Sequence, residues 1–132
     1  MRTIGLLLAA GLSLTSATAG AAAAQAQLPE APWPRAMACM AHLYVVIDKM
    51  ETEGVQTEEG QAGLEMMDLS AIFWGTQAVG MAEYTDERAE QDIAAYLAGP
   101  LGSGPEAFDS STRLANLEAC VNEAISRGAP PE

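Results

Sequence analysis

Few residues of this 132-residue chain could carry chemistry: it has one histidine, His42, and two cysteines, Cys39 and Cys120. A single histidine cannot supply a two-histidine metal site, and the cysteines do not form a Cys-x-x-Cys pair. The sequence also lacks a glycine-rich phosphate loop after a strand, a Gly-x-Ser-x-Gly motif and an acidic calcium loop. We therefore predict no catalytic residue, no metal ligand set and no cofactor, and we do not expect an enzyme.

Residues 37–42, Met-Ala-Cys-Met-Ala-His, nevertheless suggest a copper site, because thioethers and imidazole suit Cu(I). On a helix, Met37, Met40 and Tyr44 lie on one side, whereas His42 is rotated away from them by about half a turn. Ordinary packing of the methionines is therefore favoured. A small-ligand or copper site lined by Met37, Met40, Tyr44 and His42 is kept as the alternative function.

The two cysteines are predicted to form a structural disulfide between the first and last helices. In an exported protein a lone cysteine pair is usually structural, and Cys39 and Cys120 lie near opposite ends of the mature chain. Closing a loop of about 80 residues raises the free energy of the unfolded state by roughly 4.5 kcal/mol in the chain-entropy model.

Residues 1–26 have the pattern of a secretory signal peptide. Arg2 supplies a positive charge, residues 4–14 form an apolar run, and Ala24-Gln25-Ala26 provides a small-x-small cleavage site. Cleavage after Ala19 is the alternative. The apolar run is too short to span a bilayer, and no later segment reaches about 20 uncharged apolar residues. We therefore expect a periplasmic or secreted protein that has no membrane contact after cleavage.

The composition predicts one acidic folded domain. Six Lys and Arg against 18 Asp and Glu give a net charge of −12, and 49% of the residues are hydrophobic. That hydrophobic content is enough for a core. The acidic balance argues against binding nucleic acids, whose phosphates need clustered cations, and against docking on anionic membranes.

Apolar spacing of three to four residues, with cap and glycine signals, predicts an all-α, four-helix bundle-like domain. No segment shows the alternation of a strand. The expected order is a Pro-rich extended lead-in over 27–34, a single helical domain over 35–128 and a tail over 129–132. The helices are expected at 34–53, 58–82, from the Thr85 cap to Gly99, and at 111–127, and the glycine- and proline-rich residues 99–110 are expected to be a connector.

Inner faces follow from the same spacing. In the first helix they are Cys39, Leu43, Val46, Ile47 and Met50, in the third Ala89, Ile93, Tyr96 and Leu97, and in the last Leu114, Leu117, Val121, Ala124 and Ile125.

The second helix is apolar on two sides, which is typical of a central helix with neighbours on both sides. One face carries Leu64, Met67, Ala71, Ala78, Val79 and Ala82, and the other carries Met66, Leu69 and Phe73. Gly75 lies on the first face within a seam of small residues, which would let another helix approach closely. Asp68 shares that face and is expected at its rim or paired with an arginine.

These patterns favour a protein-interaction module of a chaperone-like, immunity-like or adaptor type. Met66, Leu69 and Phe73 are the predicted interaction stripe, for a second copy of the chain or for another protein, for example a basic one. In an acid-switched version, protonation of the carboxylates below about pH 4 would open the apolar interior.

Overall fold

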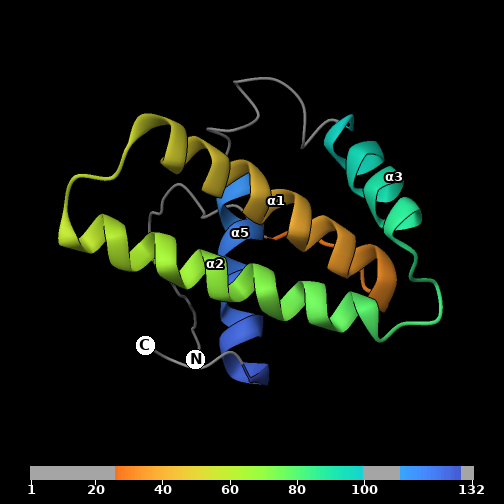
Figure 1. Ribbon diagram of the computed structural model, residues 1–132. Helices are drawn as coiled ribbons and strands as arrows, with labels where there is room; N and C mark the ends of the chain where they lie inside the picture. Colours follow the sequence, from red (N-terminus) through yellow and green to blue (C-terminus); the bar gives the residue numbers. More distant parts are fainter. Residues whose placement is uncertain (1–25, 100–110, 129–132) are drawn as a thin grey trace, which may run out of the picture.

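The computed structural model describes residues 26–99 and 111–128, and these residues contain four helices and no strand. The helices are α1 (Pro32–Glu53), α2 (Glu58–Val79), α3 (Asp86–Leu97) and α5 (Ser111–Arg127) (Figure 1). The all-α, bundle-like prediction is confirmed. The predicted signal peptide, except Ala26, the connector at 100–110 and the tail at 129–132 lie outside the described residues. None of the described helices is both long and apolar enough to cross a membrane.

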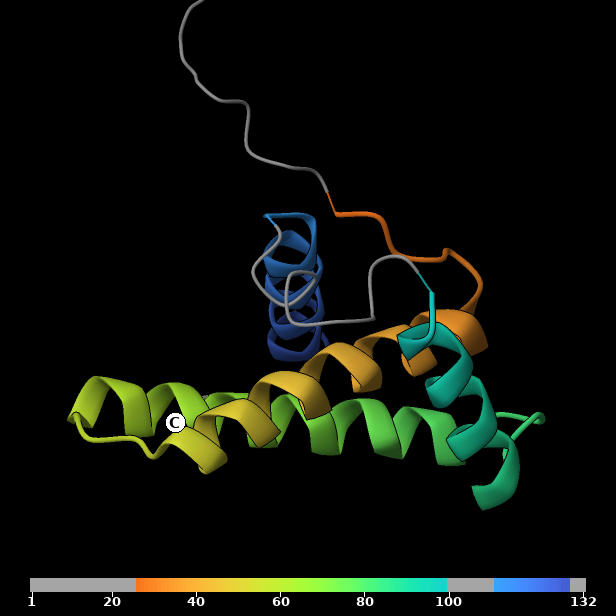
Figure 2. The same ribbon diagram turned by 90° about the horizontal axis from the view of Figure 1, so that it is seen from above.

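The helices are arranged around α1. α1 and α2 form an antiparallel hairpin, α5 crosses one face of this hairpin steeply, and α3 packs against the first half of α1 (Figures 1 and 2). α1 contacts all three other helices, whereas α2 contacts α1 and α5. The short link between α2 and α3 therefore makes an angular corner, as the sequence suggested.

Three helix ends differ from their predicted positions, and one of them is the end of α3, which lies at Leu97 and not at Gly99. α1 begins at Pro32, not Pro34, because proline suits the first turn, where its missing N–H is not needed. α2 ends at Val79, not at residue 82, because the chain forms a turn at Gly80. In this turn the Gly80 N–H donates to the Gln77 carbonyl, three residues back, at 3.2 Å.

The predicted caps of α2 and α3 are present. The Thr57 side chain accepts a hydrogen bond from the Gly60 N–H, and the Thr85 side chain accepts one from the Arg88 N–H, each at 2.9 Å. These bonds satisfy backbone donors that the first turn of a helix leaves without a partner.

The centre of the fold is the first half of α1, which corrects the prediction that the second helix is central. Every residue from Ala36 to Leu43 is buried, whereas α2 buries only Ser70, Trp74 and Ala78. Alanines at three of these positions in α1 let neighbouring helices approach from several sides.

The predicted inner face of α5 is also partly wrong. Leu117 and Ala124 are buried, but Leu114 is 58% exposed and Ile125 is 40% exposed. The residues that replace them inside the fold are Arg113, Asn116 and Cys120. Because Cys120 must face α1, α5 is rotated about its axis relative to the prediction. Its inner face therefore includes the polar residues next to Cys120.

A disulfide joins Cys39 of α1 to Cys120 of α5, as predicted, with the two Cα atoms 5.5 Å apart and both residues fully buried. The Trp74 indole N–H donates a hydrogen bond of 3.0 Å to the Cys120 carbonyl. The first, second and last helices therefore meet at one point.

α3 is held to α1 by a separate contact. The Trp33 indole N–H donates to the Asp92 carboxylate at 2.7 Å, and this bond lowers the pKa of Asp92. The Trp33 ring also meets Tyr84 edge-on at 6.5 Å, and the Arg88 guanidinium lies 5.8 Å from its centre.

We predict that replacing both cysteines in C39A/C120A lowers the free energy of unfolding by roughly 4 kcal/mol, because the disulfide constrains a long segment of the unfolded chain. Urea unfolding followed by circular dichroism measures the change. The wild type in reductant is the control and should match the double variant. Two alkylatable thiols in the denatured wild-type protein, or unchanged stability of the variant, would contradict the prediction.

Candidate functional site

A groove with a volume of about 1070 Å³ lies between α1, α2 and α3. Met40, Tyr44 and Ile47 line it from α1, a seven-residue set lines it from α2, and Tyr84, Asp86, Ala89, Glu90 and Ile93 line it from the α3 side. The α2 set is Asp68, Ala71, Ile72, Gly75, Thr76, Ala78 and Val79. No described residue of α5 lines the groove, because α5 packs elsewhere on the hairpin (Figure 2).

Large apolar side chains stand exposed around this groove. Ile72 is 63% exposed, Val79 is 60% exposed and Tyr44 is 45% exposed. Between them lies the small-residue seam, and a Cβ atom placed on Gly75 would meet no atom within 4 Å. Around Gly75 the close helix approach predicted for this seam is therefore not made by any described helix, whereas Ala78 is buried in the core and Ala71 packs against it.

The charged residues that line the groove are all acidic. They are Asp68, Asp86 and Glu90, all exposed, and the described lining contains no Lys, Arg or His. The Tyr84 hydroxyl donates a hydrogen bond to the Asp86 carboxylate, which raises the pKa of Tyr84. An apolar floor with an acidic edge suits a ligand that is apolar and cationic.

The predicted interaction stripe lies on another side of α2. Met66, Leu69 and Phe73 are each half-buried, and Phe73 packs against the core. The Phe73 ring meets the Trp74 ring edge-on at 5.2 Å, and the Arg127 guanidinium of α5 lies 5.3 Å from the Phe73 centre. α5 thus contacts the Phe73 end of the stripe, and the strongly exposed apolar residues of α2 are Ile72 and Val79.

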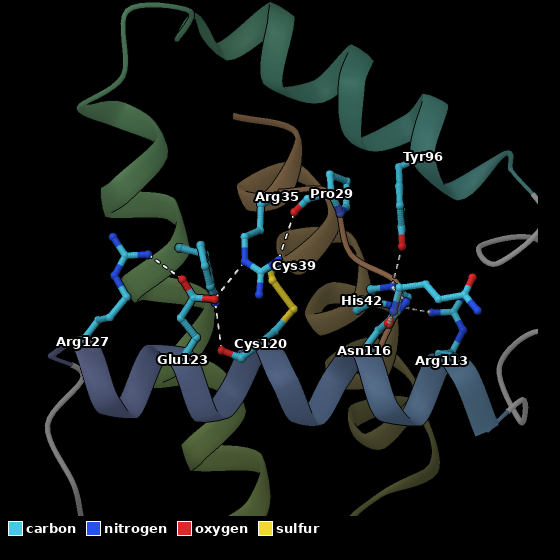
Figure 3. Close-up of a disulfide and its surroundings, with 12 residues drawn as sticks. Pro29, Arg35, Cys39, His42, Tyr96, Arg113, Asn116, Cys120, Glu123 and Arg127 are labelled. Carbon is cyan, nitrogen blue, oxygen red and sulfur yellow. Dashed lines mark hydrogen bonds and ion pairs between the residues drawn. A yellow bond between two sulfur atoms is a disulfide. The ribbon is translucent and has the colours of Figure 1, made fainter. Parts of the chain in front are cut away.

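A second feature is a polar cluster around His42, which is buried where α1, α3 and α5 meet (Figure 3). Its Nε2 lies 2.8 Å from the Tyr96 hydroxyl and 3.2 Å from the Asn116 amide nitrogen, and its Nδ1 lies 3.3 Å from Arg113 Nη1. Asn116 also accepts a hydrogen bond of 2.6 Å from the Gln27 backbone N–H, so the lead-in is tied to the same cluster.

The cluster requires His42 to be neutral. Burial, and then the charge of Arg113, lower the pKa of His42 to about 4. Because a guanidinium only donates, the Arg113 contact requires Nδ1 to accept, and in the neutral ring Nε2 then carries the proton and donates to the Tyr96 hydroxyl. The Asn116 amide nitrogen is also a donor, so in this tautomer it lies beside Nε2 without a hydrogen bond to it. Burial also raises the pKa of Tyr96, which keeps that hydroxyl neutral. A proton added to His42 would therefore place a second positive charge beside Arg113.

A network of ion pairs lies at the other end of the α1–α5 contact (Figure 3). The Glu123 carboxylate forms ion pairs with Arg35, whose Nε lies 2.9 Å from Oε1, and with Arg127, whose Nη1 lies 2.7 Å from Oε2. Burial alone would raise the pKa of Glu123, but the hydrogen bonds from Arg127 and Arg35 outweigh it and lower that pKa. Arg35 also donates to the Pro29 carbonyl at 3.0 Å, which fixes the lead-in a second time.

The residues of the alternative copper site are not brought together. Met40 and Tyr44 line the groove, Met37 is buried in the core, and His42 faces the polar cluster with α3 and α5. Over residues 26–99 and 111–128, no group of three or more His, Cys, Asp or Glu side chains could hold a metal ion.

The sequence analysis missed the partners of His42. Arg113, Asn116 and Cys120 are spaced by three and four residues, so they share one side of the last helix. Since Cys120 was expected to face the first helix, this spacing could have placed Arg113 and Asn116 inside. The stronger apolar pattern of Leu114 and Ile125 pointed to a neighbouring face.

No protein-family model matches this chain, and no curated protein and no solved structure is similar enough to match it.

Acidification is predicted to destabilise the fold through His42. Above pH 6.5 the histidine is neutral in both states, whereas between pH 6.5 and about 4 only the unfolded chain binds the proton. The free energy of unfolding should therefore fall by about 2 kcal/mol between pH 7.5 and pH 5. In H42Q, which is less stable at pH 7.5, this fall should be largely absent.

Urea unfolding of the wild type and of H42Q at pH 7.5 and pH 5 measures how much the free energy of unfolding of each protein changes. The titration of the carboxylates is common to both proteins, so it cancels when the two changes are compared. Because the chain has one histidine, NMR of the imidazole also gives its pKa without assignment. A folded-state pKa near 6.5 would contradict the prediction.

Proposed function

We propose that this chain is an exported protein-interaction module that binds a partner in the groove between α1, α2 and α3. The buried disulfide supports export, since such bonds persist in oxidising compartments, and so does the signal-like pattern of residues 1–26. The acidic chain and its apolar groove support a protein partner over a nucleic acid.

One observation carries this proposal: large apolar side chains are exposed around an open groove. Ile72 and Val79 belong to α2, and Tyr44 belongs to α1, yet none of the three is needed to fill the core. Exposed apolar residues that gather in one place mark interaction surfaces, whereas scattered ones need no explanation. Leu114 and Ile125 of α5 are also exposed, and they provide a comparison on the same molecule.

The helices around the groove are held in place before any partner arrives. Trp33 fixes α3 to α1, and the Cys39–Cys120 disulfide with Trp74 fixes α1, α2 and α5. A preformed surface loses less conformational entropy on binding than a flexible one. This arrangement favours an adaptor or immunity-like protein at neutral pH.

Site-specific crosslinking tests this function. A photo-crosslinking amino acid at Ile72 or Val79 should join the chain to the same polypeptide in cells that produce it, because both positions border the groove. The same residue at Leu114 or Ile125, which are exposed on α5, should give no such product. Equal products at all four positions, or none at the two groove positions, would count against the proposal.

An acid-activated chaperone is the second candidate function, and the buried His42 cluster favours it. Protonation of His42 beside Arg113 would weaken the junction of α1, α3 and α5, and protonation of Glu123 would weaken the pairs with Arg35 and Arg127. The apolar interior around α1 would then be released while the helices persist.

In this second case, the fluorescence of an apolar dye should rise between pH 5 and pH 3, and the protein should suppress aggregation of a client only in the acidic range. The lower stability of H42Q would by itself raise the pH at which the dye fluorescence begins to rise. Because H42Q also lacks the titration of His42, the rise should begin at a lower pH than the loss of stability alone predicts. A protein that stays closed and inactive at pH 3 would exclude the chaperone and leave the groove-binding module in place.

A further inference from the structure

The groove has the length and the small-residue floor that are needed to bind a helix. Asp68 and Val79 mark its extent along α2, and at 1.5 Å per residue they are about 16 Å apart, or three helical turns. Ala71 and Gly75 form a floor of small residues between these ends, next to Ala78, which is buried in the core. Small residues let a second backbone approach closely, and an amphipathic helix fills a groove of this kind with side chains spaced by three or four residues.

The charge of the groove selects among such helices. Asp68 lies on the α2 side, and Asp86 and Glu90 lie on the α3 side, so carboxylates border the apolar floor from both helices. The described lining has no cation to pair with an acidic ligand. The net charge of −12 attracts basic partners over a longer range.

We infer that the groove binds a cationic amphipathic helix of a partner protein, with its apolar side chains against the Ala71–Gly75 floor and its Lys or Arg side chains on the acidic rim. This inference rests on the proposed interaction function and specifies the chemistry of the partner. A second copy of this chain is a poor occupant, because two copies would bring equal negative charges together.

A designed peptide serves as the probe: eighteen residues of Leu and Lys, with Leu at the helical spacing that gives one apolar face. The first control peptide replaces Lys by Glu, and the second keeps the Leu/Lys composition in an order that has no apolar face. Fluorescence anisotropy of the labelled peptides at low and high salt measures binding. Only the amphipathic Leu/Lys peptide should bind, and salt should weaken it.

The steric test is G75L. The substitution places a side chain in the open groove, and a leucine favours a helix more than a glycine does, so the protein should melt at or above the wild-type temperature. Binding of the Leu/Lys peptide should weaken at least about tenfold. The matched control is G63L, since Gly63 lies on the same helix, has the same free space and does not line the groove. Its binding should stay within about twofold of the wild type.

The charge test compares two double variants that each remove two negative charges. D68N/E90Q neutralises two of the three rim carboxylates and should weaken binding by several-fold and reduce the salt dependence. E51Q/E118Q neutralises exposed carboxylates outside the groove and should leave binding nearly unchanged.

Several results would overturn the inference. They are failure of the Leu/Lys peptide to bind, equal binding of the peptide that has no apolar face, and equal losses in the groove and control variants. A wild-type dimer that G75L converts to a monomer in ultracentrifugation would assign the groove to a second copy instead. If groove crosslinks to a partner persist while the peptide fails, the partner chemistry is wrong and the interaction function stands.

Discussion

The fold depends on the packing of one short segment, residues 36–43 of α1, which is enclosed on all sides and joined covalently to α5. A helix can be surrounded in this way only if several of its residues are small, and three of these eight are alanine. The bond between Cys39 and Cys120 then fixes the side of α5 that faces inward. As a result, a polar side of α5 meets His42, and two leucine-sized residues of α5 remain outside.

The same crowding explains why a groove remains open. α3 packs on α1 and is joined to α2 by a short link, but it does not lie along α2. α5 crosses another part of the hairpin. The space beside Gly75 of α2 is therefore left open by the described helices, although a small residue at this position suits a close neighbour. The acidic residues that border this space come from helices that the α1 core holds in place, so their positions are set by packing far from the rim.

Local signals in the sequence predicted the helices well. Thr57 and Thr85 begin α2 and α3 as expected, and the cysteine pair was expected from its position and from the signal-like pattern of residues 1–26. What local signals could not predict is how each helix turns about its own axis. The face of α5 is chosen by Cys120 and Trp74, which lie far apart in the sequence, and this choice puts Arg113 inside and Leu114 outside. For the same reason the exposed apolar residues of α2 are not those of the predicted stripe.

The long segment that the disulfide encloses also limits what a single proteolytic cut does to the protein. Cys39 and Cys120 enclose the whole of α2 and α3, which together with α1 build the groove. A single backbone cut anywhere between the two cysteines leaves the two fragments linked through sulfur, so the pieces cannot diffuse apart. The helices that build the groove therefore stay linked after a nick that would separate the halves of a chain without this bond.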